Sequence, residues 1–127
     1  MSLERRSHSR KKMAKPYFEQ LKQLIESFDL KPAQTNNMEV KHFFSGAALY
    51  SEGVIISSLS PMGLSFKLPE MEVEQLIKEG KATYLKYFEK GNVKKSYAMF
   101  QEPNLNRVER WRSYFLKAIE FNLKNHI

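Results

Sequence analysis

The chain lacks cysteine altogether, has a single aspartate, and contains no long apolar run. The absence of cysteine excludes disulfides, thiolate zinc sites and cysteine nucleophiles. The longest apolar runs, such as residues 54–56, fall far short of the ~20 residues that a membrane-crossing helix needs. No apolar run follows the basic N-terminus, so no secretory signal is predicted. These absences favour a cytoplasmic protein that makes no membrane contact.

The formal net charge of +7 over 127 residues suggests a polyanionic partner, but the charge is unevenly distributed. Residues 1–12 hold five cations against Glu4 alone. This segment is too polar to pack, so we expect residues 1–15 to be a disordered basic tail and residues 16–127 to be a single domain. The tail could serve as a nucleic-acid arm, or it could be a solvated or partly cloning-derived extension. Short basic tails bind polyanions without selectivity, which favours the second interpretation.

Hydrophobic periodicity divides residues 16–127 into helices and strands. Apolar residues at three- and four-residue spacing predict a helix that begins at Pro16 and ends before Pro32. A second helix is predicted from Pro69 to Gly80, and a third up to about Asn125, capped by Asn104 or Asn106. Strands are predicted at residues 40–50 (with a bend at Gly46), 54–59, 64–68, 83–88 and 94–101. The order is α-β(3)-α-β(2)-α, an α+β domain whose helices cover a mainly antiparallel sheet.

No catalytic or metal-binding motif is recognisable. His8, His42 and His126 have no second histidine or carboxylate at a metal-ligand spacing on a helix. Glu39 and His42 lie on a predicted strand, whose period of two sends them to opposite faces. A nucleophile elbow, a P-loop and a dinucleotide fingerprint are all missing. We therefore expect no catalytic activity, no metal and no cofactor; a small enzyme would need a glutamate or tyrosine cluster that only the folded chain could reveal.

The last predicted helix carries two stripes. The core stripe consists of Val108, Trp111, Phe115, Ala118, Ile119 and Leu123. The α4 stripe, predicted on roughly the opposite side, consists of Arg107, Arg110, Tyr114, Lys117, Phe121 and Lys124. Cations interleaved with rings can contact phosphates while the rings stack on bases or pack on a protein partner. The alternatives are a solvated face whose rings cover nearby loops, or a homodimer contact through Tyr114 and Phe121.

A second basic region covers residues 81–97, where five lysines face only Glu89. Lys86, Lys94 and Lys95 are its candidate contacts to a partner or to nucleic acid. Lysines on edge strands also discourage strand-to-strand aggregation, which is the more economical interpretation.

Phe44, Gly46, Tyr50, Gly53, the strand at residues 64–68, Lys95, Trp111 and Ala118 follow a recognisable pattern. Residues 40–123 resemble the N-terminal domain of the TfoX (Sxy) family, known for regulators of natural competence. The family pattern is a Met-Phe-Gly-Gly bend, a Gly turn between strands, a basic hairpin and a final helix that contains tryptophan. Ser45 stands where the family has the first glycine of the bend.

The resemblance implies an α-β(3)-α-β(2)-α fold and a stand-alone form of the domain. It also implies a non-enzymatic regulatory or adaptor role through contacts with a protein partner, in transcriptional or competence regulation. Direct electrostatic binding to DNA or RNA is the alternative that the basic residues leave open.

Overall fold

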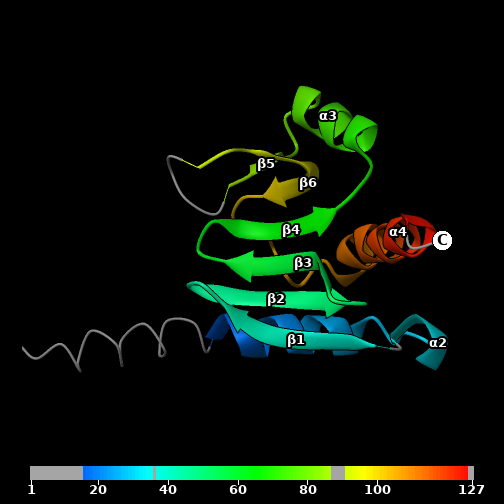
Figure 1. Cartoon of the computed structure of the whole chain (residues 1–127). Coiled ribbons are helices and arrows are strands. Elements are labelled where there is room, and N and C mark those ends of the chain that lie inside the picture. The colour runs from blue at the N-terminus through cyan, green and yellow to red at the C-terminus, as the bar shows by residue number, and fades with distance from the viewer. Residues whose placement is uncertain (1–15, 36, 87–90, 126–127) are drawn as a thin grey trace, which may run out of the picture.

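The computed structural model describes residues 16–35, 37–86 and 91–125 (Figure 1). Its antiparallel strands form one open sheet with the order β1-β2-β3-β4-β6-β5. The strands are β1 (Met38–Phe43), β2 (Gly46–Ser51), β3 (Val54–Ser60), β4 (Gly63–Lys67), β5 (Thr83–Leu85) and β6 (Lys94–Phe100). The predicted α+β class with a mainly antiparallel sheet is confirmed. The predicted tail, residues 87–88 of a predicted strand and residues 89–90 of the turn after it lie outside the described residues.

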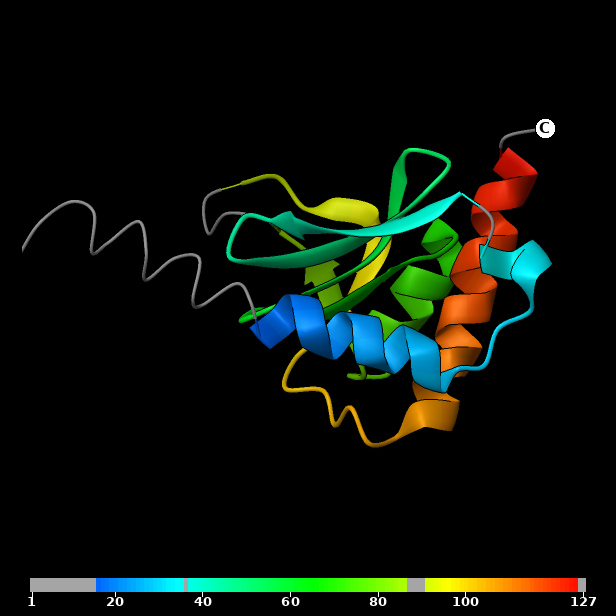
Figure 2. The ribbon, with the colours of Figure 1, turned by 90° about the horizontal axis from the view of Figure 1, so that it is seen from below.

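Helices cover one face of this sheet. A helix over residues 16–27 lies behind β1 and β2, and α4 (Val108–Asn125) lies beside it on the same side (Figure 2). The short α2 (Pro32–Thr35) follows the first helix, and α3 (Glu70–Lys78) packs at the edge formed by β5 and β6. No helix among these described segments is long and apolar enough to cross a membrane.

The core lies between the sheet and the two long helices. The predicted stripe of the first helix is confirmed, because Leu21, Leu24 and Phe28 are buried. The rings of Phe28 and Phe115 lie 5.1 Å apart and join this helix to α4. Arg112 Nε donates a 3.0 Å hydrogen bond to the carbonyl of Phe28 at the same junction. Apolar burial of this kind is the main source of stability in a domain of this size.

Two-residue turns join the first four strands. Ser51 pairs with Val54 across Glu52 and Gly53, which both have positive φ, as the twist of a tight hairpin requires. Ser60 pairs with Gly63 across the predicted Pro61-Met62 turn. β3 therefore starts at the predicted residue and ends one residue later than predicted.

The predicted single strand at residues 40–50 is wrong, because the chain reverses there and forms β1 and β2. Phe43 pairs with Gly46 across Phe44 and Ser45, and Phe44 adopts φ of +51°. The Gly46 backbone lies so close to β3 that an added Cβ would meet the Leu59 carbonyl oxygen at 2.2 Å. A turn therefore forms where the sequence shows no glycine or asparagine at either central position.

Four smaller predictions also fail. Residues 34–35, predicted as loop, belong to α2, and the predicted strand at residues 83–88 leaves the sheet after Leu85. Leu123 is 44% exposed, and Asn122 is buried in its place. Asn122 turns inward because its side chain can donate to the Ser51 carbonyl and accept from Lys67 Nζ.

The capping prediction for the last helix is the fourth failure. The backbone N–H of Trp111 donates to the Arg107 carbonyl, so Arg107 occupies the N-cap position. The Asn104 side chain accepts from the Asn106 N–H instead, and makes a turn that precedes the helix.

Candidate functional site

The α4 stripe is less open than its sequence suggests. Its cations are exposed, but Tyr114 and Phe121 are half-buried. Tyr114 lies 4.9 Å from Phe100 and 5.8 Å from Phe66, measured between ring centroids. The ammonium group of Lys67 lies 5.9 Å from the Phe121 ring. The two stripes of α4 are therefore neighbours rather than opposite faces, and both rings are engaged within the molecule.

The cations of this stripe fall into two groups along the helix. The ammonium group of Lys117 lies 5.9 Å from the centroid of the Tyr114 ring. Lys124 forms an ion pair with Glu120, which lies one turn earlier, at 3.0 Å between Nζ and Oε1. Arg107 and Arg110 lie at the start of α4 and form no ion pair with any described carboxylate. The stripe is thus paired at its C-terminal end and unpaired at its N-terminal end.

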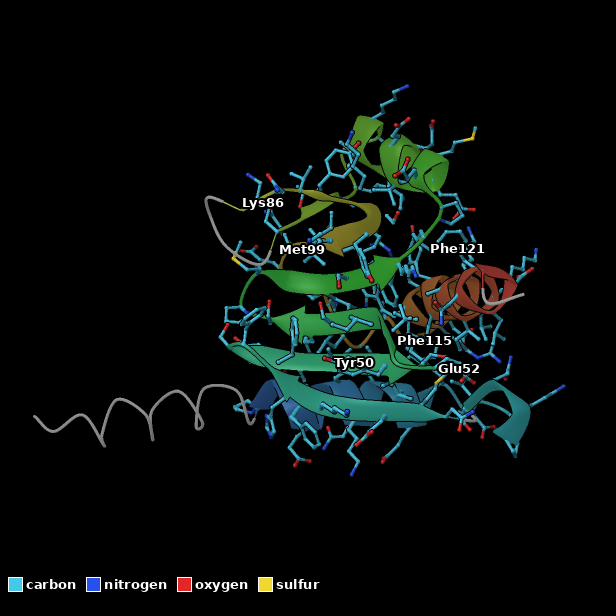
Figure 3. The ribbon with its side chains drawn as sticks, viewed as in Figure 1. Tyr50, Glu52, Lys86, Met99, Phe115 and Phe121 are labelled. Atoms are coloured by element: carbon cyan, nitrogen blue, oxygen red, sulfur yellow. The ribbon has the colours of Figure 1, made fainter. Side chains whose placement is uncertain are left out.

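The second basic region does not extend this surface. Lys94 and Lys95 begin β6, and Lys94 lies opposite Leu85 in the sheet register. Lys86 and Phe121 lie on different sides of the molecule (Figure 3). Lys86, Lys94 and Lys95 are consequently separate from the α4 stripe, and among the described lysines of this region Lys81 alone lines a cleft with its arginines.

Lys81, Arg107 and Arg110 come together around one cleft of about 320 Å³, here called the cationic cleft. Its walls are completed by Phe100, Gln101, Glu102, Pro103, Asn104 and Trp111. Glu102 is the one carboxylate among these lining residues, so the lining carries a formal net charge of +2. Lys81 also pairs with Glu79 at 3.7 Å, but both side chains are substantially exposed and such pairs contribute little.

The guanidinium group of Arg110 is held against aromatic rings. Its central carbon lies 4.9 Å from the Trp111 ring and 5.4 Å from the Phe100 ring. Trp111 itself is fixed, because it is 2% exposed and its Nε1 donates to the Asn104 carbonyl at 2.8 Å. Stacking restrains a guanidinium while leaving its N–H groups available for an oxyanion.

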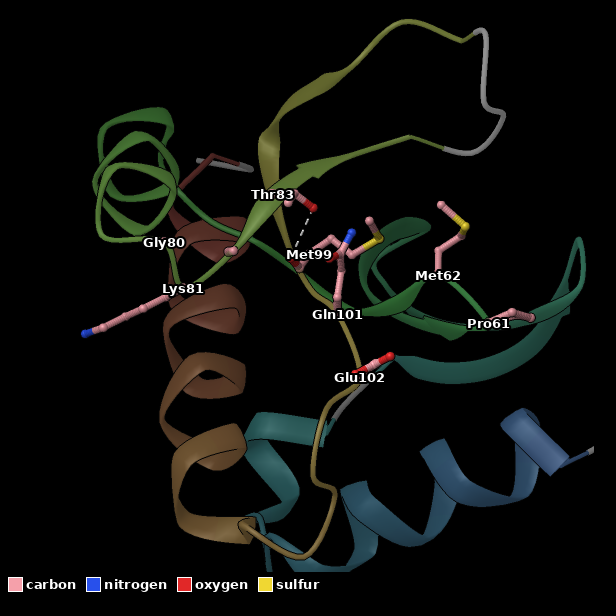
Figure 4. A pocket seen from close by; sticks show the side chains of 9 residues that line it. Pro61, Met62, Gly80, Lys81, Thr83, Met99, Gln101 and Glu102 are labelled. Atoms are coloured by element: carbon pink, nitrogen blue, oxygen red, sulfur yellow. Dashed lines mark hydrogen bonds between the residues drawn. The ribbon is translucent and has the colours of Figure 1, made fainter.

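A second cleft, of about 540 Å³, adjoins the first and shares Lys81, Gln101 and Glu102 with it (Figure 4). Pro61 and Met62 form its far side, and Thr83 Oγ1 donates to the Met99 carbonyl within it. The Lys81 side chain extends away from Pro61 and Met62 (Figure 4). Lys81 lines both clefts, whereas Arg107 and Arg110 line the first cleft and not the second.

The other candidate surface is apolar and was missed by sequence reasoning. Phe44 and Met62, from the β1–β2 and β3–β4 turns, are 60% and 50% exposed and line one small groove together with Lys86. We call these three residues the apolar tip. The Phe43 and Phe44 rings lie 4.4 Å apart, edge to face. Methionine at position 62 was visible as a turn residue, but nothing in the sequence indicated that it would lie beside Phe44.

The polar groups inside the sheet are satisfied by one another. Ser57 Oγ donates to the Ser65 carbonyl, the hydroxyls of Ser58 and Ser65 are 2.5 Å apart, and Tyr97 Oη donates to the Ile55 carbonyl. Within the described residues, no three histidine or acidic side chains are placed to hold a metal ion. Ser65, on the predicted strand at residues 64–68, is fully buried. These hydrogen bonds link neighbouring strands, so we assign these groups a structural role.

Comparison with known proteins gives no counterpart: no family model, no curated protein and no solved structure matches the chain.

Proposed function

We propose that this chain is a non-enzymatic regulatory or adaptor domain, similar to the TfoX N-terminal domain, that acts by binding a protein partner. The observation that carries the proposal is the apolar tip. Exposed aromatic and methionine side chains that share a groove are typical of protein interfaces, whereas single exposed apolar residues are common everywhere. The resemblance of residues 40–123 supports a role for such a contact in transcriptional or competence regulation.

The backbone at the tip supports the same proposal. A bulky aromatic residue rarely adopts positive φ, and Phe44 does so at +51° while its ring stays largely in solvent. Asparagine or glycine would suit this turn better. Backbone strain of this kind tends to occur at functional positions. Lys86 beside the ring favours a partner surface that offers an apolar pocket flanked by carboxylates.

Substitution Phe44→Asn tests this proposal, because it removes the ring and fits the left-handed backbone. The matched control is Met71→Ser, since Met71 is 83% exposed but lies on α3. With each protein immobilised, a partner retained by the wild type and by M71S should be lost from F44N, in line with the ~2 kcal/mol or more that an interface anchor contributes. Equal retention by F44N would overturn the proposal.

Direct binding to DNA or RNA is the alternative, and the unpaired Arg107 and Arg110 favour it. Fluorescence anisotropy with duplex DNA and with RNA, at increasing salt, tests it. The measurement is made on the whole chain and on residues 13–127, which lack the five cations of residues 1–12. Arg110→Ala and Lys117→Ala should each weaken binding and lower the salt slope by about 0.9 per lost phosphate contact. No binding of residues 13–127 at low salt would exclude this alternative for the folded domain.

A homodimer through Tyr114 and Phe121 is a further arrangement of the same surface. A solution mass at twice the monomer value of 15.0 kDa would indicate it. Disruption of that dimer by Phe121→Ser would then assign the contact to the α4 stripe.

A further inference from the structure

We propose that the cationic cleft binds a phosphomonoester group. The cleft is formed by two separate parts of the chain: Lys81 follows α3, whereas Arg107 and Arg110 belong to the start of α4. Its net formal charge of +2 matches a phosphomonoester, which carries close to two negative charges at neutral pH. Its volume of about 320 Å³ is at the lower end for small-ligand sites, which suits a phosphate and a short adjoining group. This site is independent of the protein contact proposed above.

Arg107 and Arg110 occupy positions at the start of α4 where a positive charge is electrostatically unfavourable. The N-terminus of a helix carries partial positive charge, so arginine at the N-cap and in the first turn raises the energy of the free protein. Glu109 is the one acidic residue of that turn and offsets this only in part. Side-chain acceptors normally occupy the N-cap, yet here a cation does. A bound dianion would remove this conflict by neutralising both arginines and the helix end together.

The hydrogen-bond donors of the cleft are also held in place before any ligand binds. Arg110 is restrained by the Trp111 and Phe100 rings, and no described carboxylate pairs with Arg107 or Arg110. Guanidinium groups bind phosphate oxygens through paired N–H donors, and lysine adds a point charge. A phosphodiester carries one charge fewer and a second bulky substituent, so it leaves the cleft less well neutralised.

Trp111 supplies the reporter for the test, because it is the only tryptophan of the chain and lines the cleft. Its fluorescence is followed in the full chain at pH 7.5 while inorganic phosphate is added, with sodium chloride at equal ionic strength as the reference. We expect a saturable change with phosphate and none with chloride. Arg107→Gln and Arg110→Gln should each weaken phosphate binding at least tenfold. Lys22→Gln, the same charge change on an exposed residue of the first helix outside the cleft, should not weaken it.

Three further probes identify the source of the phosphate: O-phosphoserine, a phosphoserine heptapeptide, and a 12-base-pair DNA duplex. Similar binding of the first two indicates a small phosphorylated ligand, and tighter binding of the peptide indicates a phosphorylated protein; both support the site. A phosphate response no larger than that of chloride overturns the proposal, as does an unchanged response in both arginine variants. Tighter cleft-dependent binding of DNA than of O-phosphoserine overturns the assignment to a monoester. Loss of partner binding by F44N with an unchanged phosphate response separates this site from the proposed protein contact.

Discussion

The cationic cleft and the apolar tip differ in chemistry and in support. The cleft is charged and lies on a rigid base, because Trp111 and Phe100 are buried beneath its arginines. The tip is apolar and is formed by two hairpin turns whose side chains extend into solvent. Met62 lines both the groove of the tip and the cleft that adjoins the cationic one. The second cleft therefore lies between two surfaces of different character and shares lining residues with both.

What the two regions share is a conflict with local preference. At the cleft, arginine takes an N-cap position that favours serine or aspartate. At the tip, phenylalanine takes a turn conformation that favours asparagine or glycine. Gly53 and Gly80 follow the preference for glycine at positive φ, whereas Glu52 and Glu102 depart from it as Phe44 does. Sites where a chain departs from its own local rules are the expected places for function.

Removing the base of the cleft should have the largest effect. Trp111→Ala deletes a 2% exposed side chain that packs on Phe66 and Phe100 and donates to a backbone carbonyl. We expect a loss of about 3–5 kcal/mol in the free energy of unfolding, measured by circular dichroism in urea. The control Met71→Ala, on an 83% exposed residue, should stay within about 0.5 kcal/mol. A loss below 1 kcal/mol would contradict the rigid-base description.

Crowding the base of the tip should come next. A Cβ at Gly46 would lie 2.2 Å from the Leu59 carbonyl oxygen, which is backbone and cannot rotate away. Gly46→Ala should therefore cost about 1–3 kcal/mol in urea unfolding. Gly53→Asn is the matched control, because nothing lies within 4 Å of its added Cβ and asparagine tolerates its φ of +76°. An equal effect of both substitutions would contradict close approach to β3 as the reason for glycine at position 46.

Replacing Arg107 at the N-cap of α4 should change the free energy of unfolding by a smaller amount and in the opposite direction. Arg107→Ser supplies a side-chain acceptor for the first turn of α4 and removes a cation from the positive end of the helix dipole. We expect the free energy of unfolding to rise by about 0.5–1.5 kcal/mol. The same variant should lose its response to phosphate. A fall in stability would mean that Arg107 is held by its surroundings and is not in conflict with them.

The sequence predicted what depends on neighbours along the chain. The stripe of the first helix, the presence of α3 and the ends of the strands beside Gly53 and Pro61 follow from spacing and local conformation. The Phe44-Ser45 reversal was not predictable in this way, because it is imposed by the close contact of Gly46 with β3. Such a contact exists only after the sheet has formed.

The same distinction between local and long-range contacts applies to the candidate site. The cations at positions 107 and 110 were predicted correctly as members of an exposed stripe. Their meeting with Lys81 depends on the path between β6 and α4, which no spacing reveals. The burial of Tyr114 was missed for a related reason, since the helical wheel assumes one flat partner surface and α4 instead contacts β3, β4 and the Phe100 ring.

The smallest predicted effect compares the two ends of α4 directly. Lys124 lies in the last turn, where the helix dipole favours cations, and pairs with Glu120 four residues earlier at 3.0 Å. A double-mutant cycle of Glu120→Ala and Lys124→Ala should give a coupling of about 0.3–0.5 kcal/mol that disappears in 1 M salt. Lys124→Ala should thus lower stability where Arg107→Ser raises it, although both remove one exposed cation from the same helix. If both substitutions shift stability in the same direction, net charge rather than position governs this helix, and the argument that the cationic cleft is in conflict with its fold would fail.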